Sequence, residues 1–226
     1  EVIYLIPDVK PHYLRLTLND TGDYCSGLIE NITDMVIEKE QIEYERDHDQ
    51  LTGLLNRRAF HRIMKELFWQ GETTLKIAAL VMIDLDGLKY VNDTYGHTYG
   101  DQYIKSAAEV FVESVPENTL ISRPGGDEFY ILFYGYSSRS EIQRYLDQLE
   151  KDIRAQSILL PNGDPFMLHL SAGVAWYPDD TTDRKEFTQY ADFAMYQIKR
   201  TVKDKFGDFD KEAYRTSQEQ YNKEKD

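Results

Sequence analysis

The sequence predicts an α/β fold in which a mixed central β-sheet is flanked by helices, and three observations support this fold class. An almost continuous apolar run, KIAALVMI at residues 76–83, is typical of a strand that is buried on both faces. Amphipathic helical patterns precede and follow this run. Shorter strand patterns then alternate with further helices along the chain. Because the two element types alternate, we expect the helices to cover both faces of one sheet.

The composition is that of a folded domain with a strongly acidic surface. The chain has 226 residues, of which 41% are hydrophobic, and its formal net charge is −14. This apolar content is sufficient for a packed core. The negative charge repels nucleic-acid phosphates and anionic membranes, so we expect neither as a partner. A phosphate ligand remains compatible with this charge, because a metal ion can supply the positive charge locally.

The cellular location follows from what the sequence lacks. The single cysteine, Cys25, cannot form an internal disulfide, which suits a reducing compartment. No apolar run approaches the roughly 20 residues that cross a bilayer. We therefore expect a cytoplasmic location, with the chain as an excised piece of a larger protein that a membrane segment could anchor.

Residues 1–33 show strand patterns that are too few for an independent domain. Residues 13–18 alternate with period two, residues 19–23 form a turn cluster, and residues 24–32 are a second candidate strand. One hairpin is too small a sheet to be stable alone. We therefore expect residues 1–33 to be the remnant of an N-terminal domain.

A connecting helix is expected over residues 34–48. Thr33 can cap it, and one narrow apolar stripe runs between charged clusters. Such a stripe favours a helix that pairs with another copy of the chain, and a solvated linker helix explains the pattern equally well.

The main domain is expected over residues 49–208. Helical patterns cover residues 57–68, 102–115, 140–154 and 186–200, and strand patterns cover residues 76–83, 119–122, 129–134 and 168–176. Residues 209–226 are polar and charged, so we expect a mobile C-terminal linker there.

The first cluster of chemical interest follows the apolar strand. Asp84 would lie at the last buried position, where a carboxylate is costly unless a cation neutralises it. Gly87 lets backbone N–H groups approach a phosphate, and Lys89 adds a positive charge beside it. The alternative interpretation is a surface turn with a helix-capping aspartate, and this cluster alone favours that alternative.

The second cluster is the turn at residues 125–128. Gly125 and Gly126 suit a tight hairpin turn, whereas the adjacent carboxylates of Asp127 and Glu128 are more than a turn requires. In a mixed sheet this turn can lie beside Asp84. Oxygen ligands of this kind select Mg²⁺ rather than zinc, and two Mg²⁺ ions can activate a hydroxyl and neutralise a triphosphate leaving group. A solvated hairpin without chemistry is the alternative.

Four strings together resemble one known family. The string RPGGDEF at residues 123–129 resembles the RxGGDEF signature of the GGDEF family. In order and spacing, three further strings resemble its other motifs: DQLTGLLNRR at 49–58, DLDGLKYVNDTYGHTYGD at 84–101 and ADFAMY at 191–196. The resemblance covers about residues 47–206. The N-terminal strands and the helix after them resemble the end of a PAS-type sensor that feeds such a domain.

This resemblance implies a fold and an activity. The fold would be similar to nucleotidyl cyclase and palm-type polymerase domains. The activity would be that of a diguanylate cyclase, which condenses two GTP molecules into cyclic di-GMP and two pyrophosphates with Mg²⁺ (or Mn²⁺). Each protomer would hold one GTP, so catalysis would need a homodimer.

The resemblance also implies the roles of individual residues. Asp84, the Leu85 carbonyl, Asp127 and Glu128 would hold the metal ions. Asp127 would also accept the proton from the attacking hydroxyl, with Glu128 supporting the second metal, and Lys89 would stabilise charge in the transition state.

The resemblance also implies which residues bind the nucleotide, namely Gly87, Leu88, Asn92, His97, Asp101, Lys199 and Lys203. Asn92 and Asp101 would bind the guanine edge, while the other residues would contact the phosphates, except that His97 equally suits holding its own loop. Two positions depart from the family pattern. Leu88 replaces the usual Phe, and Lys203 replaces an Arg, which loses a bidentate contact to the triphosphate.

A second function class remains open, namely a non-catalytic GTP-binding module that regulates a neighbouring domain. The intact signature at residues 125–128 argues against it, because degenerate modules usually lose one of these residues. A receptor for cyclic di-GMP, as a third possibility, would need a product-binding site.

The first testable prediction concerns that product-binding site. Many family members carry an RxxD motif before the signature turn, but here Pro116 and Thr119 occupy the positions of the Arg and the Asp. Neither can make the charge-assisted contacts, so product binding should weaken by roughly a hundredfold. We expect little inhibition when cyclic di-GMP is added at saturating GTP in an initial-rate series. Strong inhibition that excess GTP does not relieve would contradict this.

Overall fold

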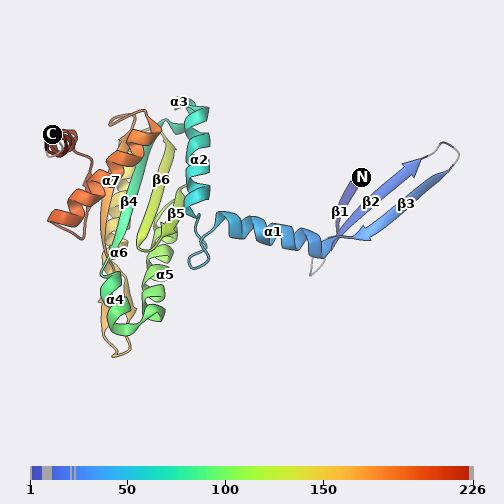
Figure 1. The fold of residues 1–226 in the computed structure, drawn as a ribbon, viewed down its shortest axis with the longest axis horizontal. Helices are drawn as coiled ribbons and strands as arrows, with labels where there is room; N and C mark the ends of the chain where they lie inside the picture. The colour runs from blue at the N-terminus through green and yellow to red at the C-terminus, as the bar shows by residue number, and fades with distance from the viewer. Residues whose placement is uncertain (1, 7–11, 21, 23, 224–226) are drawn as a thin grey trace. The chain divides into compact units, whose positions relative to one another are not determined.

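The computed structural model describes residues 2–6, 12–20, 22 and 24–223, and the chain divides into two compact units between Asp47 and His48. In the first unit, β1 (Val2–Ile6), β2 (His12–Asp20) and β3 (Cys25–Asn31) form an antiparallel sheet in that order (Figure 1). The hairpin expected at residues 13–32 is confirmed, and β1 adds a strand that had not been expected. The PAS-like origin of this unit stays a prediction.

The connecting helix is α1 (Thr33–Asp47), close to the expected range. The Thr33 hydroxyl accepts a hydrogen bond from the backbone N–H of Tyr13 at 2.9 Å, which ties the start of the helix to β2. None of the α1 side chains is buried. Helix α1 therefore gains little stability from packing within its own unit.

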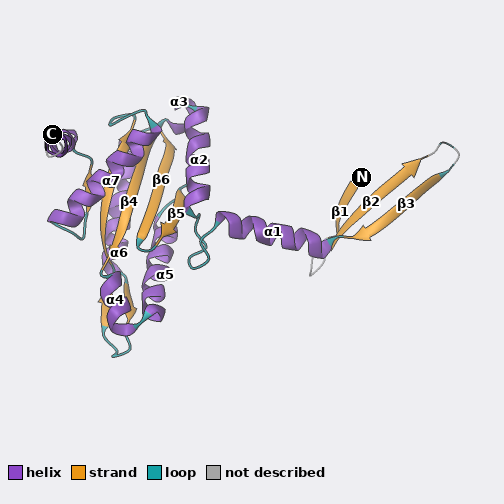
Figure 2. Ribbon diagram, viewed as in Figure 1, coloured by secondary structure: helices purple, strands orange, loops and turns teal. Residues whose placement is uncertain are grey.

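The second unit contains a mixed five-stranded sheet, as predicted. Its strand order is β10-β9-β4-β6-β5 (Figure 2). The bounds are β4 (Ile77–Asp86), β5 (Leu120–Gly125), β6 (Glu128–Tyr136), β9 (His169–Tyr177) and β10 (Phe206–Asp208). Only the β9–β10 pair is parallel. Strand β4 lies at the centre, and eight of its ten residues are buried.

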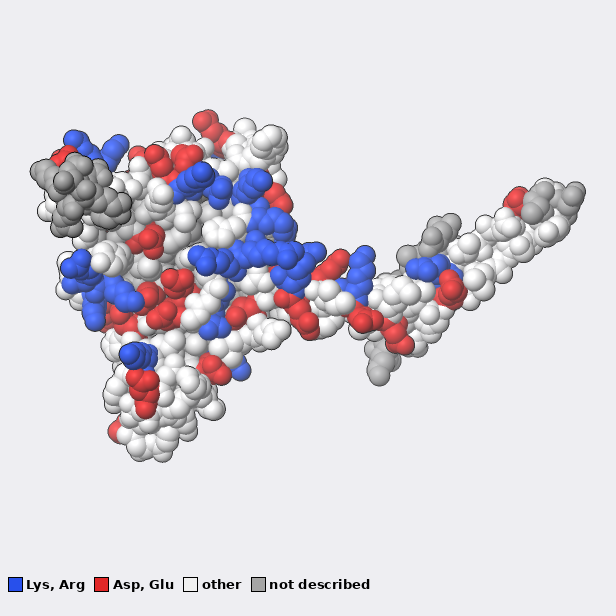
Figure 3. Space-filling view, in the orientation of Figure 1, with Lys and Arg blue, Asp and Glu red and all other residues white. Residues whose placement is uncertain are grey.

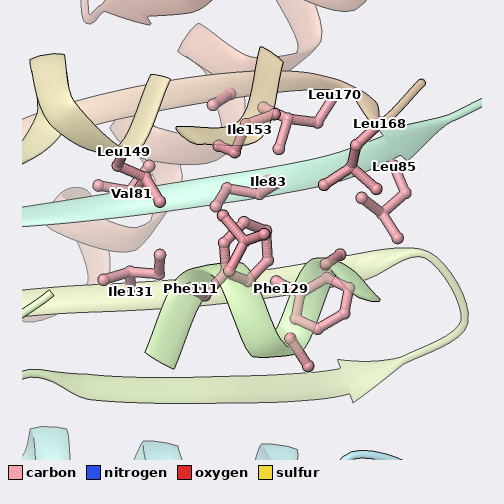
Figure 4. Close-up of a cluster of buried hydrophobic side chains, with 14 of the residues drawn as sticks. Val81, Ile83, Leu85, Phe111, Phe129, Ile131, Leu149, Ile153, Leu168 and Leu170 are labelled. Atoms are coloured by element: carbon pink, nitrogen blue, oxygen red, sulfur yellow. The ribbon is translucent and has the colours of Figure 1, made fainter. Parts of the chain in front are cut away.

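Helices cover both faces of this sheet. The helices are α2 (Arg57–Gln70), α3 (Glu72–Leu75), α4 (Leu88–Tyr95), α5 (His97–Ser114), α6 (Arg139–Ala155) and α7 (Arg184–Thr201). Val81, Ile83 and Leu85 of β4 point toward α5 and α6 (Figure 4), where Phe111 and Phe129 pack edge to face at 5.0 Å. The alternate residues Leu80 and Met82 face α2 and α7. The period of two along β4 thus divides the core into two halves.

Several short elements escaped the sequence analysis. They are α3, α4, β10 and a hairpin of β7 (Ser157–Leu159) with β8 (Pro165–Met167). Among the residues that the structure describes, no helix is long and apolar enough to span a membrane.

The C-terminal segment also differs from expectation. Where a mobile linker was expected from residue 209, the structure has helix α8 (Lys211–Lys223). Phe209 is buried and stacks on Tyr190 with ring centroids 4.0 Å apart, and Tyr214 of α8 packs edge-on against both rings. This aromatic cluster attaches α8 to α7. It was missed because aromatic residues spaced along a polar segment leave no periodic signal.

Helix α7 lies unusually close to the sheet at Gly173 of β9. A Cβ atom at this glycine would collide with the backbone nitrogen of Met195 and the carbonyl oxygen of Ala191. Backbone atoms inside a helix cannot move aside without shifting the helix. The absence of a side chain at Gly173 therefore sets how deeply α7 packs.

The second prediction tests this close contact. Gly173→Ala should lower the free energy of unfolding by about 3 kcal/mol, because the added methyl overpacks a rigid contact. Gly163→Ala is the matched control: that glycine has a φ of 86° and open space around it, so only backbone strain of about 1–2 kcal/mol applies. Urea denaturation measures both values. Equal losses would show that α7 can move away at little cost.

Candidate active site

The two acidic clusters of the sequence analysis lie side by side at one end of the sheet. In the antiparallel β4–β6 ladder, Asp84 is paired with Glu128. The backbone N–H of Leu85 also donates to the carbonyl oxygen of Asp127 at 2.9 Å. The expected proximity of the two turns is therefore confirmed. By the alternation along β4 and β6, Asp84 and Glu128 project from the sheet face that α2 and α7 cover.

Asp84 is buried, and its charge is neutralised by a lysine. Only 6% of its surface is exposed, and its carboxylate accepts a hydrogen bond from the Lys199 ammonium at 2.6 Å. Burial raises the pKa of Asp84, Lys199 opposes this rise, and the charge of Asp127 adds to it. Burial alone would lower the pKa of Lys199, but the hydrogen bond that it donates to Asp84 raises this pKa above its ordinary value. The contact thus favours the charged form of Lys199, while for Asp84 it offsets only part of the effect of burial.

This placement of Lys199 differs from its expected role. The family resemblance puts Lys199 at the terminal phosphates, whereas the structure puts its ammonium on the carboxylate that is expected to hold the metal. Its pKa is also raised by the charges of Asp127 and Asp86, so the ammonium lies within the field of three carboxylates. The ammonium of Lys199 thus occupies a position where these three carboxylates favour a cation.

The donor set suits a hard cation, although it is not assembled as a cage. Within the described part of the chain, no three or more His, Cys, Asp or Glu side chains are grouped closely enough to hold a metal ion. The neighbouring carboxylates of Asp84, Asp127 and Glu128 nevertheless offer only oxygen, the ligand atom that Mg²⁺ prefers. The buried carboxylate of Asp84, when it is ionised, needs a cation beside it. The chemistry of these oxygen donors therefore fits Mg²⁺, while in this structure the cation on Asp84 is the Lys199 ammonium.

Asp86 contributes differently from Asp84. Its carboxylate accepts a hydrogen bond from the Ser171 hydroxyl on β9 at 2.7 Å. Asp86 therefore fixes β9 beside the end of β4. Its position within the motif at residues 84–101 did not predict this contact.

Arg123 holds the signature turn, and the sequence analysis assigned it no role. Its guanidinium donates to both carboxylate oxygens of Asp49, at 3.0 and 3.1 Å, and to the carbonyl oxygen of Gly126, at 2.8 Å. The Asp49 carboxylate also accepts from the Thr52 hydroxyl at 2.7 Å. Burial would raise the pKa of Asp49, but Thr52 and Arg123 hold it below its usual value. In the sequence, the one sign of the contact between Arg123 and Asp49 is that each residue belongs to a motif.

The residues expected to contact the base lie around α4 and the start of α5. Asn92, partly buried on α4, touches Gly100, because a Cβ there would collide with its side-chain oxygen. This places Asn92 next to Asp101, the residue after Gly100. Asp101 and His97 are both exposed on the first turns of α5. The structure thus brings Asn92 against the residue that precedes Asp101, and the assignment of both to one base stays a prediction.

The residues expected at the phosphates are less closely gathered. Gly87 ends β4 in a left-handed conformation, Leu88 is buried as the first residue of α4, and Lys89 is exposed on that helix. Lys203 is exposed beyond the end of α7 and has a φ of 52°. That left-handed conformation is costly for a lysine.

Positive charge borders this acidic site, although the chain as a whole is acidic. Basic side chains gather on the face of the domain where α2 lies (Figure 3), and α2 contains Arg57, Arg58, Arg62 and Lys65. Burial, together with the charge of Glu128, raises the pKa of Tyr130, and the charge of Arg57 opposes that rise. Arg57 therefore acts electrostatically on Tyr130, which lies two residues after Glu128 of the signature turn.

The fold and the site define an α/β domain in which a buried carboxylate and an acidic hairpin turn meet at one end of a mixed sheet. Residues 46–205 match the family described as "Diguanylate cyclase, GGDEF domain", and the chain belongs to this GGDEF family. The family assignment and the fold class expected from the sequence are thereby confirmed.

Relatives and solved structures agree with this assignment. An uncharacterized membrane protein of Staphylococcus aureus is 35% identical over 147 residues, which is 64% of this chain and 41% of the relative. The chain therefore spans about two fifths of that relative. The GGDEF domain of TpbB (YfiN) from Pseudomonas aeruginosa is 29% identical with a TM-score of 0.67, covering 76% of this chain and 99% of that one. The GGDEF domain of DgcB from Caulobacter crescentus, solved in complex with c-di-GMP, is 26% identical with a TM-score of 0.63, covering 72% and 95%.

The third prediction concerns the Asp84–Lys199 pair. Lys199→Met leaves the buried carboxylate without its cation, so in EDTA at pH 7 the free energy of unfolding should fall by about 1–3 kcal/mol. The pKa of Asp84 already lies above its unfolded value, and losing Lys199 raises it further. The destabilisation should therefore shrink as the pH falls and Asp84 becomes protonated.

Urea denaturation between pH 7 and pH 5 measures this trend. The double variant Asp84→Asn/Lys199→Met is the control, because it removes the charge together with its partner and should show no such pH dependence. A constant difference between Lys199→Met and the wild type across this range would mean that the ion pair does not act as described.

Proposed function

We propose that this chain is a diguanylate cyclase that condenses two GTP molecules into cyclic di-GMP and two pyrophosphates, with Mg²⁺ (or Mn²⁺) as the metal. The proposal rests mainly on one observation: the complete signature turn lies directly against the end of β4. The backbone N–H of Leu85 donates to the carbonyl oxygen of Asp127, and Asp84 lies opposite Glu128 in the β4–β6 ladder. A regulatory module without chemistry would have no need for a buried carboxylate beside two more in the adjacent turn.

The proposed roles distribute the work between the two turns. Asp84, Asp127, Glu128 and the Leu85 carbonyl would hold Mg²⁺, which would neutralise the triphosphate and lower the pKa of the attacking hydroxyl. The Asp127 carboxylate would accept the proton of that 3′-hydroxyl. Lys89, which is exposed on the first turn of α4, would stabilise the charge that develops on the phosphate oxygens.

The remaining residues would bind and orient GTP. Asn92 and Asp101 would pair with the guanine edge, and the backbone of Gly87 and Leu88 would approach the phosphates. When the metal binds, the ammonium of Lys199 would leave Asp84 and contact the terminal phosphates instead. The exposed Lys203 would add a weaker contact there, and His97 would contact the nucleotide or hold its loop.

The reaction would take place between two copies of the chain. One domain offers one set of guanine- and phosphate-binding residues, whereas the product contains two guanosine monophosphates joined head to tail. A homodimer would bring two GTP molecules face to face, so that each 3′-hydroxyl attacks the other's α-phosphorus. In the full-length protein a PAS-like sensor would control this assembly from the cytoplasmic side.

The fourth prediction tests the activity itself. Incubation with GTP and Mg²⁺ should yield cyclic di-GMP, detected by chromatography, and Asp84→Asn should reduce the rate by about 10³-fold, since a metal ligand contributes several kcal/mol to the transition state. The amide can still accept from Lys199, so the melting temperature should hold or rise.

Asp179→Asn is the matched control for this experiment. It makes the same chemical change at an exposed carboxylate beyond the far end of β9, and the rate should not change. If the wild type binds GTP but forms no product, the chain is a GTP-binding regulatory module instead. An Asp84→Asn protein with the wild-type rate would refute the metal assignment.

A further inference from the structure

The β7–β8 hairpin packs against the turn that is expected to meet the phosphates. Its Phe166 side chain lies against Gly87, and a Cβ added at Gly87 would come within 3.2 Å of the Phe166 ring. The same ring stacks on Tyr90 of α4, with centroids 6.0 Å apart and an interplanar angle of 28°. The hairpin and α4 lie at the same end of the domain (Figure 1). Phe166 therefore contacts both ends of the first turn of α4.

A second aromatic residue, Tyr103, supports this turn by packing against Phe166 and bonding to the end of β4. Tyr103 of α5 is fully buried and meets the Phe166 ring edge-on at 5.4 Å. Its hydroxyl donates to the carbonyl oxygen of Asp86 and accepts from the backbone N–H of His169, both at 2.9 Å. Burial raises the pKa of Tyr103 to about 12, so the hydroxyl keeps its proton. Tyr103 thus joins the ends of β4 and β9 and supports Phe166.

The start of α4 depends on packing because no side chain caps it and its N-cap residue is a glycine. Gly87 has a φ of 86° and a ψ of −7°, and no side chain caps the start of α4. A glycine in this position loses more conformational entropy than any other residue when it is fixed. Lys89 and Asn92 follow on α4, so a small rotation at Gly87 would displace both side chains. The aromatic contacts restrict this rotation.

We propose that Phe166 is a positioning residue for the nucleotide: by packing on Gly87 and Tyr90 it holds the first turn of α4, and with it Lys89 and Asn92, in the orientation that binds GTP. This inference rests on the proposed function. Phe166 lies outside the four motifs, so its role arises from the fold and not from the family signature. The hairpin thereby supports the substrate site through its contacts with Gly87 and α4.

The fifth prediction compares Phe166→Ala with two matched variants. Phe166→Ala should lower kcat/KM for GTP by about 10- to 100-fold, mainly through KM, because displacement of binding groups by about 1 Å has effects of this size. Phe166→Leu, which restores an apolar contact, should recover to within about threefold of the wild type. Leu159→Ala, an exposed apolar residue in the same hairpin, should change nothing.

A second readout does not depend on turnover. In the absence of nucleotide, amide hydrogen exchange at residues 88–92 should be about tenfold faster in Phe166→Ala than in the wild type, and unchanged in Leu159→Ala. GTP affinity measured by calorimetry should fall about tenfold in Phe166→Ala. If the wild type binds GTP but forms no product, the cyclase proposal fails, while the affinity and exchange data still decide the role of Phe166.

If Phe166→Ala does not fold, Tyr90→Ala takes its place, since Tyr90 is half exposed and its loss removes the other side of the stack. It should raise KM and hydrogen exchange by about threefold. Folded Phe166→Ala, or Tyr90→Ala in its place, with wild-type KM, affinity and exchange at residues 88–92 would overturn the inference.

Discussion

The register of β4 between β6 and β9 is the constraint on which the site depends. In this register Asp84 faces Glu128 on one side and Ser171 on the other. Because side chains alternate, a slip of one residue would turn Asp84 toward α5 and α6 and bring Leu85 to the functional face. The register is in turn fixed by the core, since Val81, Ile83 and Leu85 must all face the same helices. Apolar packing along β4 therefore positions a carboxylate that is itself unfavourable to bury.

The close approach of α7 to β9 compensates for that burial. Gly173 allows the α7 backbone to pack directly on the sheet, and this depth brings Lys199, near the end of α7, to Asp84 at 2.6 Å. A buried carboxylate without a cation would be destabilising, by the about 1–3 kcal/mol expected for Lys199→Met. The lysine thus keeps the site folded in the absence of metal, and its reach to the phosphates would depend on the same placement.

The sequence predicted the long elements of this fold well, because β4 and the helices α2, α5, α6 and α7 have strong periodic patterns. It missed α4 and the β7–β8 hairpin, which are too short to show a period, although Phe166 and Tyr90 from these elements brace the Gly87 turn. The proximity of the two acidic turns was predictable from sheet topology. The contact between Lys199 and Asp84 was not, because residues 115 positions apart meet only through the packing of α7.

Three of the four motifs that appear as separate strings in the sequence are joined by hydrogen bonds in the structure. Asp49 of the first string holds Arg123 of the signature, and Arg123 holds the Gly126 carbonyl. The signature turn bonds to the end of β4 through Leu85 and Asp127. Asp49 lies only two residues after α1 ends at Asp47. Through this single guanidinium, a residue near the start of the second unit is bonded to the turn that carries the proposed catalytic carboxylates. The first residues of the second unit and its proposed catalytic turn are thus joined by hydrogen bonds within that unit.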